Sequence, residues 1–106
     1  MVNIASVLGR RGAPNFSAYC ASKAAVMAFS ESLSKELKDE HIQVSVVSPG
    51  TADTGFRKGH EGRPQTPDLV DPEKMLRSAD VAEAVVWVLK ASRHVAALQV
   101  VMEPIG

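Results

Sequence analysis

Residues 42–47 place the strongest constraint on what this chain of 106 residues can fold into. The segment holds one isoleucine and three valines, so its apolar side chains are all β-branched. That density is typical of a strand buried within a parallel sheet, and Pro49-Gly50 ends it. Sheets of this kind are covered by helices, so the flanking sequence is expected to be helical.

A long helical pattern precedes this strand. Residues 18–40 are rich in alanine and contain neither glycine nor proline, and Ser17 is placed to cap the first turn. One face of the pattern is bulky and apolar, which predicts packing against the sheet, and another is made only of alanine. The bulky face comprises Val26, Phe29, Leu33 and Leu37, and the small face comprises Ala18, Ala21, Ala25 and Ala28.

A second helix is predicted over residues 81–92, with Asp80 as its cap. Its apolar positions recur at helical spacing and define one face toward the core. Trp87 is interpreted as part of the same packing. The apolar face comprises Val81, Ala84, Val85, Val88 and Leu89.

Two more apolar segments, residues 2–5 and 95–102, are predicted strands, and residues 51–78 form a long polar loop broken by glycine and proline. Strands thus alternate with helices along the chain. This alternation predicts an α/β fold with a parallel sheet of three strands, two main helices and right-handed crossovers. Ligands bind such sheets beyond the carboxyl ends of the strands, where Ser6, Pro49 and Gly50 lie.

Composition excludes several classes of protein. The chain has 12 basic and 12 acidic residues and a formal net charge of zero, so nothing draws it to nucleic acid or to an anionic membrane. Its single cysteine, Cys20, makes no internal disulfide and suits a reducing compartment. Its three histidines lack the spacing of metal ligands, so no metal site is expected. We therefore expect a cytoplasmic protein that binds a small molecule.

Tyr19 and Lys23 lie four residues apart on the first predicted helix and share one face. An ammonium group beside a phenol favours the phenolate, which is how a tyrosine becomes a general acid or base near neutral pH. Ser6 lies thirteen residues before Tyr19, at the carboxyl end of a strand, where its hydroxyl can bind a substrate oxygen. The Tyr-x-x-x-Lys pair alone occurs often by chance, so the wider pattern has to decide.

That pattern resembles the short-chain dehydrogenase/reductase family in order, spacing and placement on predicted strands and helices. The resemblance runs over most of the chain and is weakest over residues 55–78. The motifs that carry it are Asn3-Ile4-Ala5-Ser6, Tyr19-Cys20-Ala21-Ser22-Lys23 and Ser48-Pro49-Gly50-Thr51-Ala52-Asp53-Thr54.

The resemblance implies a catalytic role for three residues. Tyr19 matches the tyrosine that passes a proton to or from the substrate oxygen. Lys23 matches the lysine that supports that tyrosine and bonds the nicotinamide ribose. Ser6 matches the serine that positions the carbonyl or alcohol. The implied reaction is reversible hydride transfer between a nicotinamide cofactor, NAD or NADP, and an alcohol/carbonyl pair.

The resemblance also implies cofactor-binding residues and a substrate loop. Tyr19 and Lys23 bind the cofactor as well, and the turn that holds the nicotinamide end follows the second strand. Residues 51–78 match the substrate-binding loop. The residues of the turn are Pro49, Gly50, Thr51 and Thr54.

The glycine-rich phosphate-binding turn that the family carries in its first half does not occur in these 106 residues. The resemblance therefore implies that residues 1–106 are the C-terminal half of a doubly wound Rossmann-type domain, truncated to three strands. We expect the intact enzyme to be a homo-oligomer and the 106 residues alone to be inactive. An inactive fragment that serves only for packing or dimerisation is the main alternative, and a binding domain without redox chemistry is a third.

Overall fold

The strand β2 (Ser45–Pro49) lies at the centre of the fold. In the computed structural model, which describes residues 1–53 and 72–105, the first four residues of β2 are buried. This strand pairs in parallel with β1 (Val2–Ile4) on one side and with β5 (Gln99–Met102) on the other. The parallel sheet of three strands predicted from the sequence is confirmed, in the order β1-β2-β5.

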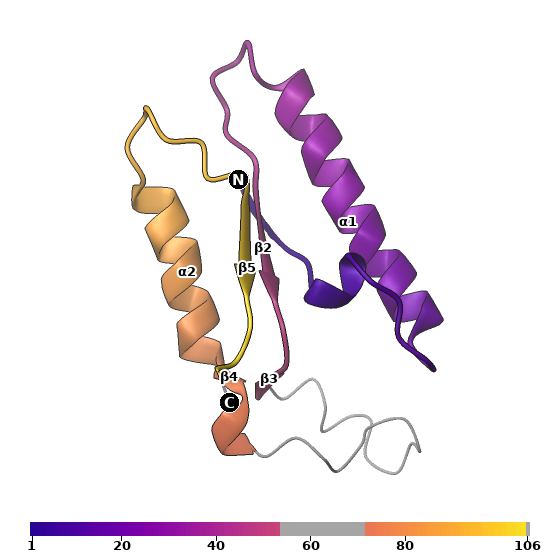
Figure 1. Cartoon of the computed structure of the whole chain (residues 1–106). Helices are drawn as coiled ribbons and strands as arrows, with labels where there is room; N and C mark the ends of the chain where they lie inside the picture. The colour runs from indigo at the N-terminus through magenta and orange to yellow at the C-terminus, as the bar shows by residue number, and fades with distance from the viewer. Residues whose placement is uncertain (54–71, 106) are drawn as a thin grey trace.

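The other elements connect these strands and cover them (Figure 1). The short strands β3 (Ala52–Asp53) and β4 (Leu76–Arg77) form a parallel pair separate from the main sheet, which was not predicted from the sequence. In chain order the elements are η1 (Val7–Gly9), α1 (Ser17–Glu36), β3 (Ala52–Asp53), η3 (Pro72–Lys74), β4 (Leu76–Arg77) and α2 (Ser78–Lys90).

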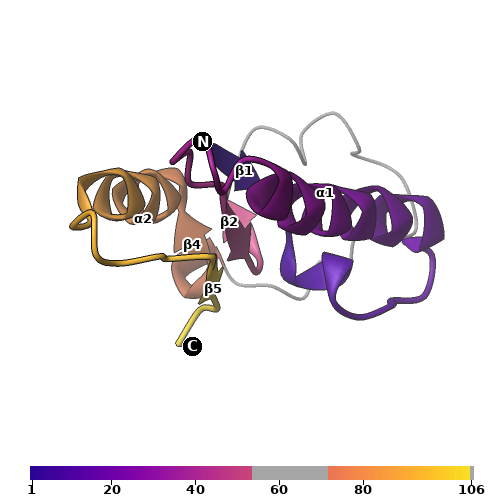
Figure 2. The same cartoon turned by 90° about the horizontal axis from the view of Figure 1, so that it is seen from above.

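The two helices cover opposite faces of the sheet, as two perpendicular views show (Figures 1 and 2). Because the strands advance in one direction, helices on opposite faces require crossovers of opposite hand. The connection β1-α1-β2 is right-handed, as expected, but β2-α2-β5 is left-handed, so the prediction of right-handed crossovers is wrong there. The long connection between β2 and α2 has the length to reach the other face.

The strands β2 and β5 begin later than predicted, at Ser45 and Gln99, whereas β1 begins at Val2 as predicted. Ile42 and Val95, the first apolar residues of the two predicted strands, are 46% and 45% exposed. Both residues therefore lie in the loops that precede β2 and β5. At its other end β2 continues through Pro49, which pairs with Met102. Proline is acceptable at a strand end, where its missing N–H costs little.

The helix α1 is shorter than predicted, and its buried face is centred elsewhere. It begins at Ser17, so the predicted N-cap is its first residue, and it ends at Glu36. Ser30 is 1% exposed and lies against the sheet, whereas Phe29 is 59% exposed. The other members of the predicted bulky face, Val26, Leu33 and Leu37, are half-buried on one side of Ser30.

Most of the predicted apolar face of α2 is partly or fully buried, but the largest side chains of the helix are not. Val88 is buried and Val85 is half-buried, whereas Leu89 is 65% exposed. Trp87 is 58% exposed, so the expectation that it packs in the core is wrong. It is one position away from the face that meets the sheet, and adjacent helical residues point about 100° apart.

Asp80 stabilises the start of α2 from within the helix. The helix begins at Ser78, so Asp80 is its third residue and not the predicted N-cap. Its carboxylate accepts the backbone N–H of Arg77 at 2.8 Å and the Arg77 guanidinium at 2.6 Å. These hydrogen bonds, together with the charge of Arg77, hold the pKa of Asp80 below its usual value.

We predict that Asp80→Asn lowers the melting temperature at pH 7. An aspartate with a depressed folded-state pKa stabilises the fold above its unfolded pKa, and this contribution disappears as pH falls through the folded-state value. The difference in melting temperature between wild type and variant should therefore shrink below about pH 4. Thermal unfolding from pH 2.5 to 7 measures it. Glu83→Gln, on the same helix, is the control, and a constant difference across that range would contradict the prediction.

Candidate active site

The predicted site residues gather at one edge of the sheet. Because the three strands are parallel, their carboxyl ends share an edge, and α1 returns antiparallel so that its first turns lie at the same edge (Figure 1). Ser6 follows β1, Tyr19 and Lys23 lie on the first two turns of α1, and Gly50 follows β2. This is the edge at which open α/β sheets bind ligands.

Ser6 is buried, with 6% of its surface exposed, and its backbone is extended at the start of η1. Its hydroxyl oxygen accepts the backbone N–H of Leu8 at 3.2 Å, and its carbonyl accepts the N–H of Gly9 at 2.9 Å. A serine hydroxyl can accept and donate at once. The hydroxyl is thus oriented by the backbone and keeps its own proton to donate.

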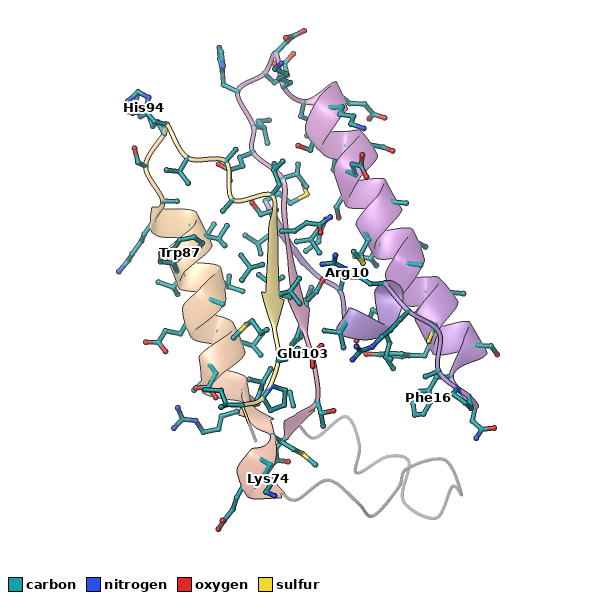
Figure 3. All side chains as sticks on the ribbon, in the orientation of Figure 1. Arg10, Phe16, Lys74, Trp87, His94 and Glu103 are labelled. Atoms are coloured by element: carbon teal, nitrogen blue, oxygen red, sulfur yellow. The ribbon has the colours of Figure 1, made fainter. Side chains whose placement is uncertain are left out.

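The ammonium of Lys23 lies between the strand β1 and the ring of Tyr19. Its Nζ atom donates to the backbone carbonyl of Ile4 at 3.3 Å and is 5.8 Å from the centroid of the tyrosine ring. Both side chains are half-buried, and the tyrosine ring packs edge-on against Phe16, which Figure 3 shows at the start of α1. An ammonium has three donors, so Lys23 keeps two beyond Ile4.

Gly9 is a site residue that the sequence analysis did not single out. A Cβ atom at this position would lie 2.9 Å from the backbone carbon and oxygen of Lys23 and 2.9 Å from the sulfur of Met27. Only glycine lets η1 approach α1 this closely. Its position three residues after Ser6, at the end of the short helix, is the signal that could have identified it.

Backbone hydrogen bonds connect the turn after β2 to β5 and to β4. The N–H of Gly50 donates to the carbonyl of Met102 at 2.7 Å, and the N–H of Leu76 donates to the carbonyl of Thr51 at 2.9 Å. Pro49, Gly50 and Thr51 are half-buried. Thr54, the last predicted cofactor-binding residue, lies outside the described residues.

An ion pair crosses the same edge. The guanidinium of Arg11, in the loop before α1, contacts the carboxylate of Glu103 just after β5 at 3.3 Å. Both side chains are more than half exposed, and such pairs contribute about 0–1 kcal/mol. In residues 1–53 and 72–105, no group of three acidic, cysteine or histidine side chains is placed to hold a metal ion.

Comparison with known proteins places the chain in a family. The model for short chain dehydrogenases matches residues 1–64. The chain belongs to the short-chain dehydrogenase family. The bovine dehydrogenase/reductase SDR family member 11 is 36% identical over 110 aligned residues, which cover 98% of this chain and 43% of that protein.

Solved structures of dehydrogenases have the same fold. An alcohol dehydrogenase from the archaeon Thermococcus sibiricus, complexed with 5-hydroxy-NADP, has a TM-score of 0.76 at 25% identity, covering 98% of this chain and 41% of that one. A 4-hydroxyisoleucine dehydrogenase complexed with NADH has a TM-score of 0.74 at 25% identity, with coverages of 97% and 44%. The α/β fold predicted as part of a Rossmann-type sheet is confirmed, and the chain spans about two fifths of these relatives.

We predict that Gly9→Ala lowers both stability and turnover in the intact protein. The added methyl group forces η1 away from Lys23, and overpacking of this kind costs about 1–3 kcal/mol. Thermal unfolding and steady-state kinetics measure the two effects. Gly12→Ala is the matched control, because a Cβ atom there meets nothing within 4 Å. Equal behaviour of the two variants would show that the close approach at Gly9 is unimportant.

Proposed function

We propose that this chain supplies the proton-transfer site of an NAD(P)-dependent oxidoreductase that interconverts an alcohol and a carbonyl compound. The observation that carries the proposal is the ammonium of Lys23 beside the ring of Tyr19 at the carboxyl edge, in a member of the short-chain dehydrogenase family. Ser6 lies at the same edge with its hydroxyl oriented by Leu8.

Each residue has a distinct task in this proposal. In the reductive direction the phenol of Tyr19 gives its proton to the substrate oxygen, and in the oxidative direction the phenolate accepts it. The ammonium of Lys23 stabilises the phenolate by its positive charge. The hydroxyl of Ser6 donates a hydrogen bond to the same substrate oxygen and so orients the reacting carbon.

The residues at this edge fit a nicotinamide cofactor. When bound, this group supplies or accepts the hydride. The two remaining donors of Lys23 suit the hydroxyls of its ribose, and Thr51 together with the backbone beyond Gly50 suits its carboxamide. Thr54 is proposed for the same role. Two of the related structures contain such cofactors, NADH in one and 5-hydroxy-NADP in the other, which supports the class of cofactor and not the choice between NAD and NADP.

We further propose that residues 51–78 bind the substrate, a small alcohol or carbonyl compound. The pairing of β3 with β4 brings the two ends of this segment together next to Gly50, beside the proposed cofactor site. We propose a cytoplasmic homo-oligomer as the working state. In the described part of the chain no helix is long and apolar enough to cross a membrane.

A packing or dimerisation module is the second candidate function. The small face of α1 favours it, because its four alanines are all exposed and would allow another helix to approach closely. The two candidates differ in one assay. An enzyme oxidises or reduces its cofactor when alcohols and carbonyl compounds are supplied, whereas a packing module does not.

We predict that Tyr19→Phe in the intact protein lowers kcat by about 10²–10⁴-fold, the usual contribution of a general acid or base. The substitution keeps the ring and its packing against Phe16, so cofactor affinity should change little. Initial rates with NADH and NADPH and a cofactor fluorescence titration measure the two quantities. Unchanged turnover would remove the proposed role of Tyr19.

We predict that Lys23→Ala raises the dissociation constant of the cofactor and lowers kcat, each by roughly 10–100-fold, because hydrogen bonds to a charged group contribute about 1.5–3 kcal/mol. Lys35→Ala is the control on the same helix, since its ammonium pairs with Glu31 at 2.7 Å away from the site. A loss of turnover with unchanged cofactor affinity would contradict the dual role.

A further inference from the structure

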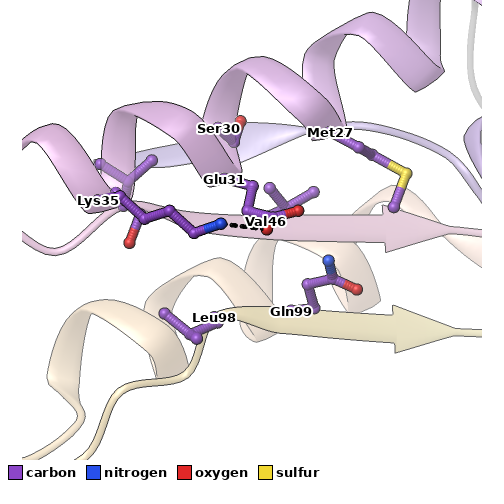
Figure 4. A pocket seen from close by; sticks show the side chains of 9 residues that line it. Met27, Ser30, Glu31, Lys35, Val46, Leu98 and Gln99 are labelled. Carbon is purple, nitrogen blue, oxygen red and sulfur yellow. Dashed lines mark hydrogen bonds and ion pairs between the residues drawn. The ribbon is translucent and has the colours of Figure 1, made fainter.

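A part-buried polar link joins β1 to α1 behind the candidate active site. The side-chain amide of Asn3 donates to the hydroxyl oxygen of Ser30 at 2.9 Å, and this hydroxyl donates to the carbonyl of Val26 at 2.7 Å. Ser30 is 1% exposed and is the single buried residue of α1. It lines a groove together with Val46 of the central strand β2 (Figure 4).

Stability alone does not call for polar groups at this position. Burying an amide and a hydroxyl has a desolvation cost that their hydrogen bond largely offsets, whereas two apolar side chains of similar shape would pack there at little or no loss. Apolar contacts, however, are non-directional and allow a helix to slide along a strand. A hydrogen bond to Ser30 fixes the level of Asn3, that is, its position along the axis of the helix.

The backbone of β1 is bonded to β2, but few polar contacts join β1 directly to α1. The strand is three residues long, and Ile4 is 42% exposed. Between β1 and α1 the structure gives two side-chain hydrogen bonds in the described residues, Asn3 to Ser30 and Lys23 to Ile4. The second bond uses the ammonium that the proposed function assigns to the cofactor. The Asn3–Ser30 bond is therefore the one of the two that involves no group assigned to the cofactor or the substrate.

We propose that Asn3 and Ser30 are positioning residues that set the level of Ser6 relative to Tyr19 and Lys23, an inference that rests on the proposed function. Ser6 is three residues beyond Asn3, and Lys23 is seven residues, two helical turns, before Ser30. A slip of one helical residue moves the two parts by about 1.5 Å. A misplacement of about 1 Å can cost a factor of about 100 in rate.

The groove beside this link is not the proposed ligand site. It has a volume of about 540 Å³ and lies between α1 and the strands β2 and β5, with Glu31 and Lys35 paired at its rim (Figure 4). It includes Ser30 and Met27 but none of Ser6, Tyr19 and Lys23. Of the residues changed in the variants below, Ser30 lines this groove and Asn3 does not, and Ser30→Ala removes one oxygen atom from its wall.

The test compares Asn3→Leu, Ser30→Ala and the double variant in the intact protein. Each single variant breaks the bond, and Ser30→Ala leaves the Asn3 amide without its acceptor, so its melting temperature falls. The double variant removes both polar groups and regains melting temperature relative to Ser30→Ala. We expect kcat to fall about 10–100-fold in all three variants, with KM and cofactor affinity within about twofold of wild type. Recovery of kcat together with melting temperature in the double variant would show a purely structural pair and overturn the proposal.

Ser45→Ala is the matched control. Ser45 is also 1% exposed, and its hydroxyl is hydrogen-bonded to the side chain of Gln43 at 3.2 Å, but it does not link β1 to α1. This variant should lose melting temperature and keep kcat within about twofold of wild type. A loss of kcat equal to that of Ser30→Ala would mean that any buried hydroxyl has this effect, and the proposal would fail.

A second readout separates this inference from the proposed function. Wild-type protein that turns over no alcohol or carbonyl compound with either cofactor would refute the proposed function. The positioning role can still be measured by NMR, because the ring signals of Tyr19 are identified as those that disappear in Tyr19→Phe. These signals should move in the folded double variant and stay in place in Ser45→Ala. Unmoved signals in the double variant would overturn the positioning role.

Discussion

The close packing of η1 on α1 at Gly9 is the contact on which the candidate site depends. It brings the backbone that follows Ser6 against the backbone of Lys23, so serine, tyrosine and lysine come from two elements held together without an intervening side chain. A methyl group at this point would separate them. The two hydrogen bonds between α1 and β1, at Ile4 and at Asn3, then set the level of the helix along the strand. Packing determines the distance between the two elements, and polar bonds determine their register.

The topology of the sheet determines where the site can lie. Parallel strands bring their carboxyl ends to one edge, and both helices run back antiparallel to them, so the residues after β1 and β2 and the first turns of α1 share that edge. The left-handed connection to β5 sends α2 to the opposite face. As a result α1 leaves one face of β5 open, and Gln99 and Leu98 border the groove there. The polar edge thus follows from the parallel direction of the strands, and the open groove follows from the left-handed connection to β5.

Much of this arrangement could be predicted from the sequence, because strand burial and helical spacing leave clear patterns. The run of β-branched residues identified β2, and the spacing of Ser6, Tyr19 and Lys23 identified the candidate site. The apolar periodicity gave the wrong buried residue of α1 at a position where the structure has a polar contact. It placed Phe29 on the buried face of α1, whereas the hydrogen bond from Asn3 turns Ser30 toward the sheet. Apolar spacing also carries no information on the hand of a crossover or on a close backbone approach such as that of Gly9.

The decisive measurement is a crystal structure of the intact protein with an oxidised or reduced nicotinamide cofactor and a carbonyl or alcohol ligand. We expect the Tyr19 and Ser6 hydroxyls both to lie within hydrogen-bond distance, about 2.6–3.2 Å, of one ligand oxygen. We also expect Lys23 to contact the ribose while Asn3 remains bonded to Ser30. A ligand oxygen bound by neither hydroxyl, or a cofactor bound away from this edge, would contradict the proposed site.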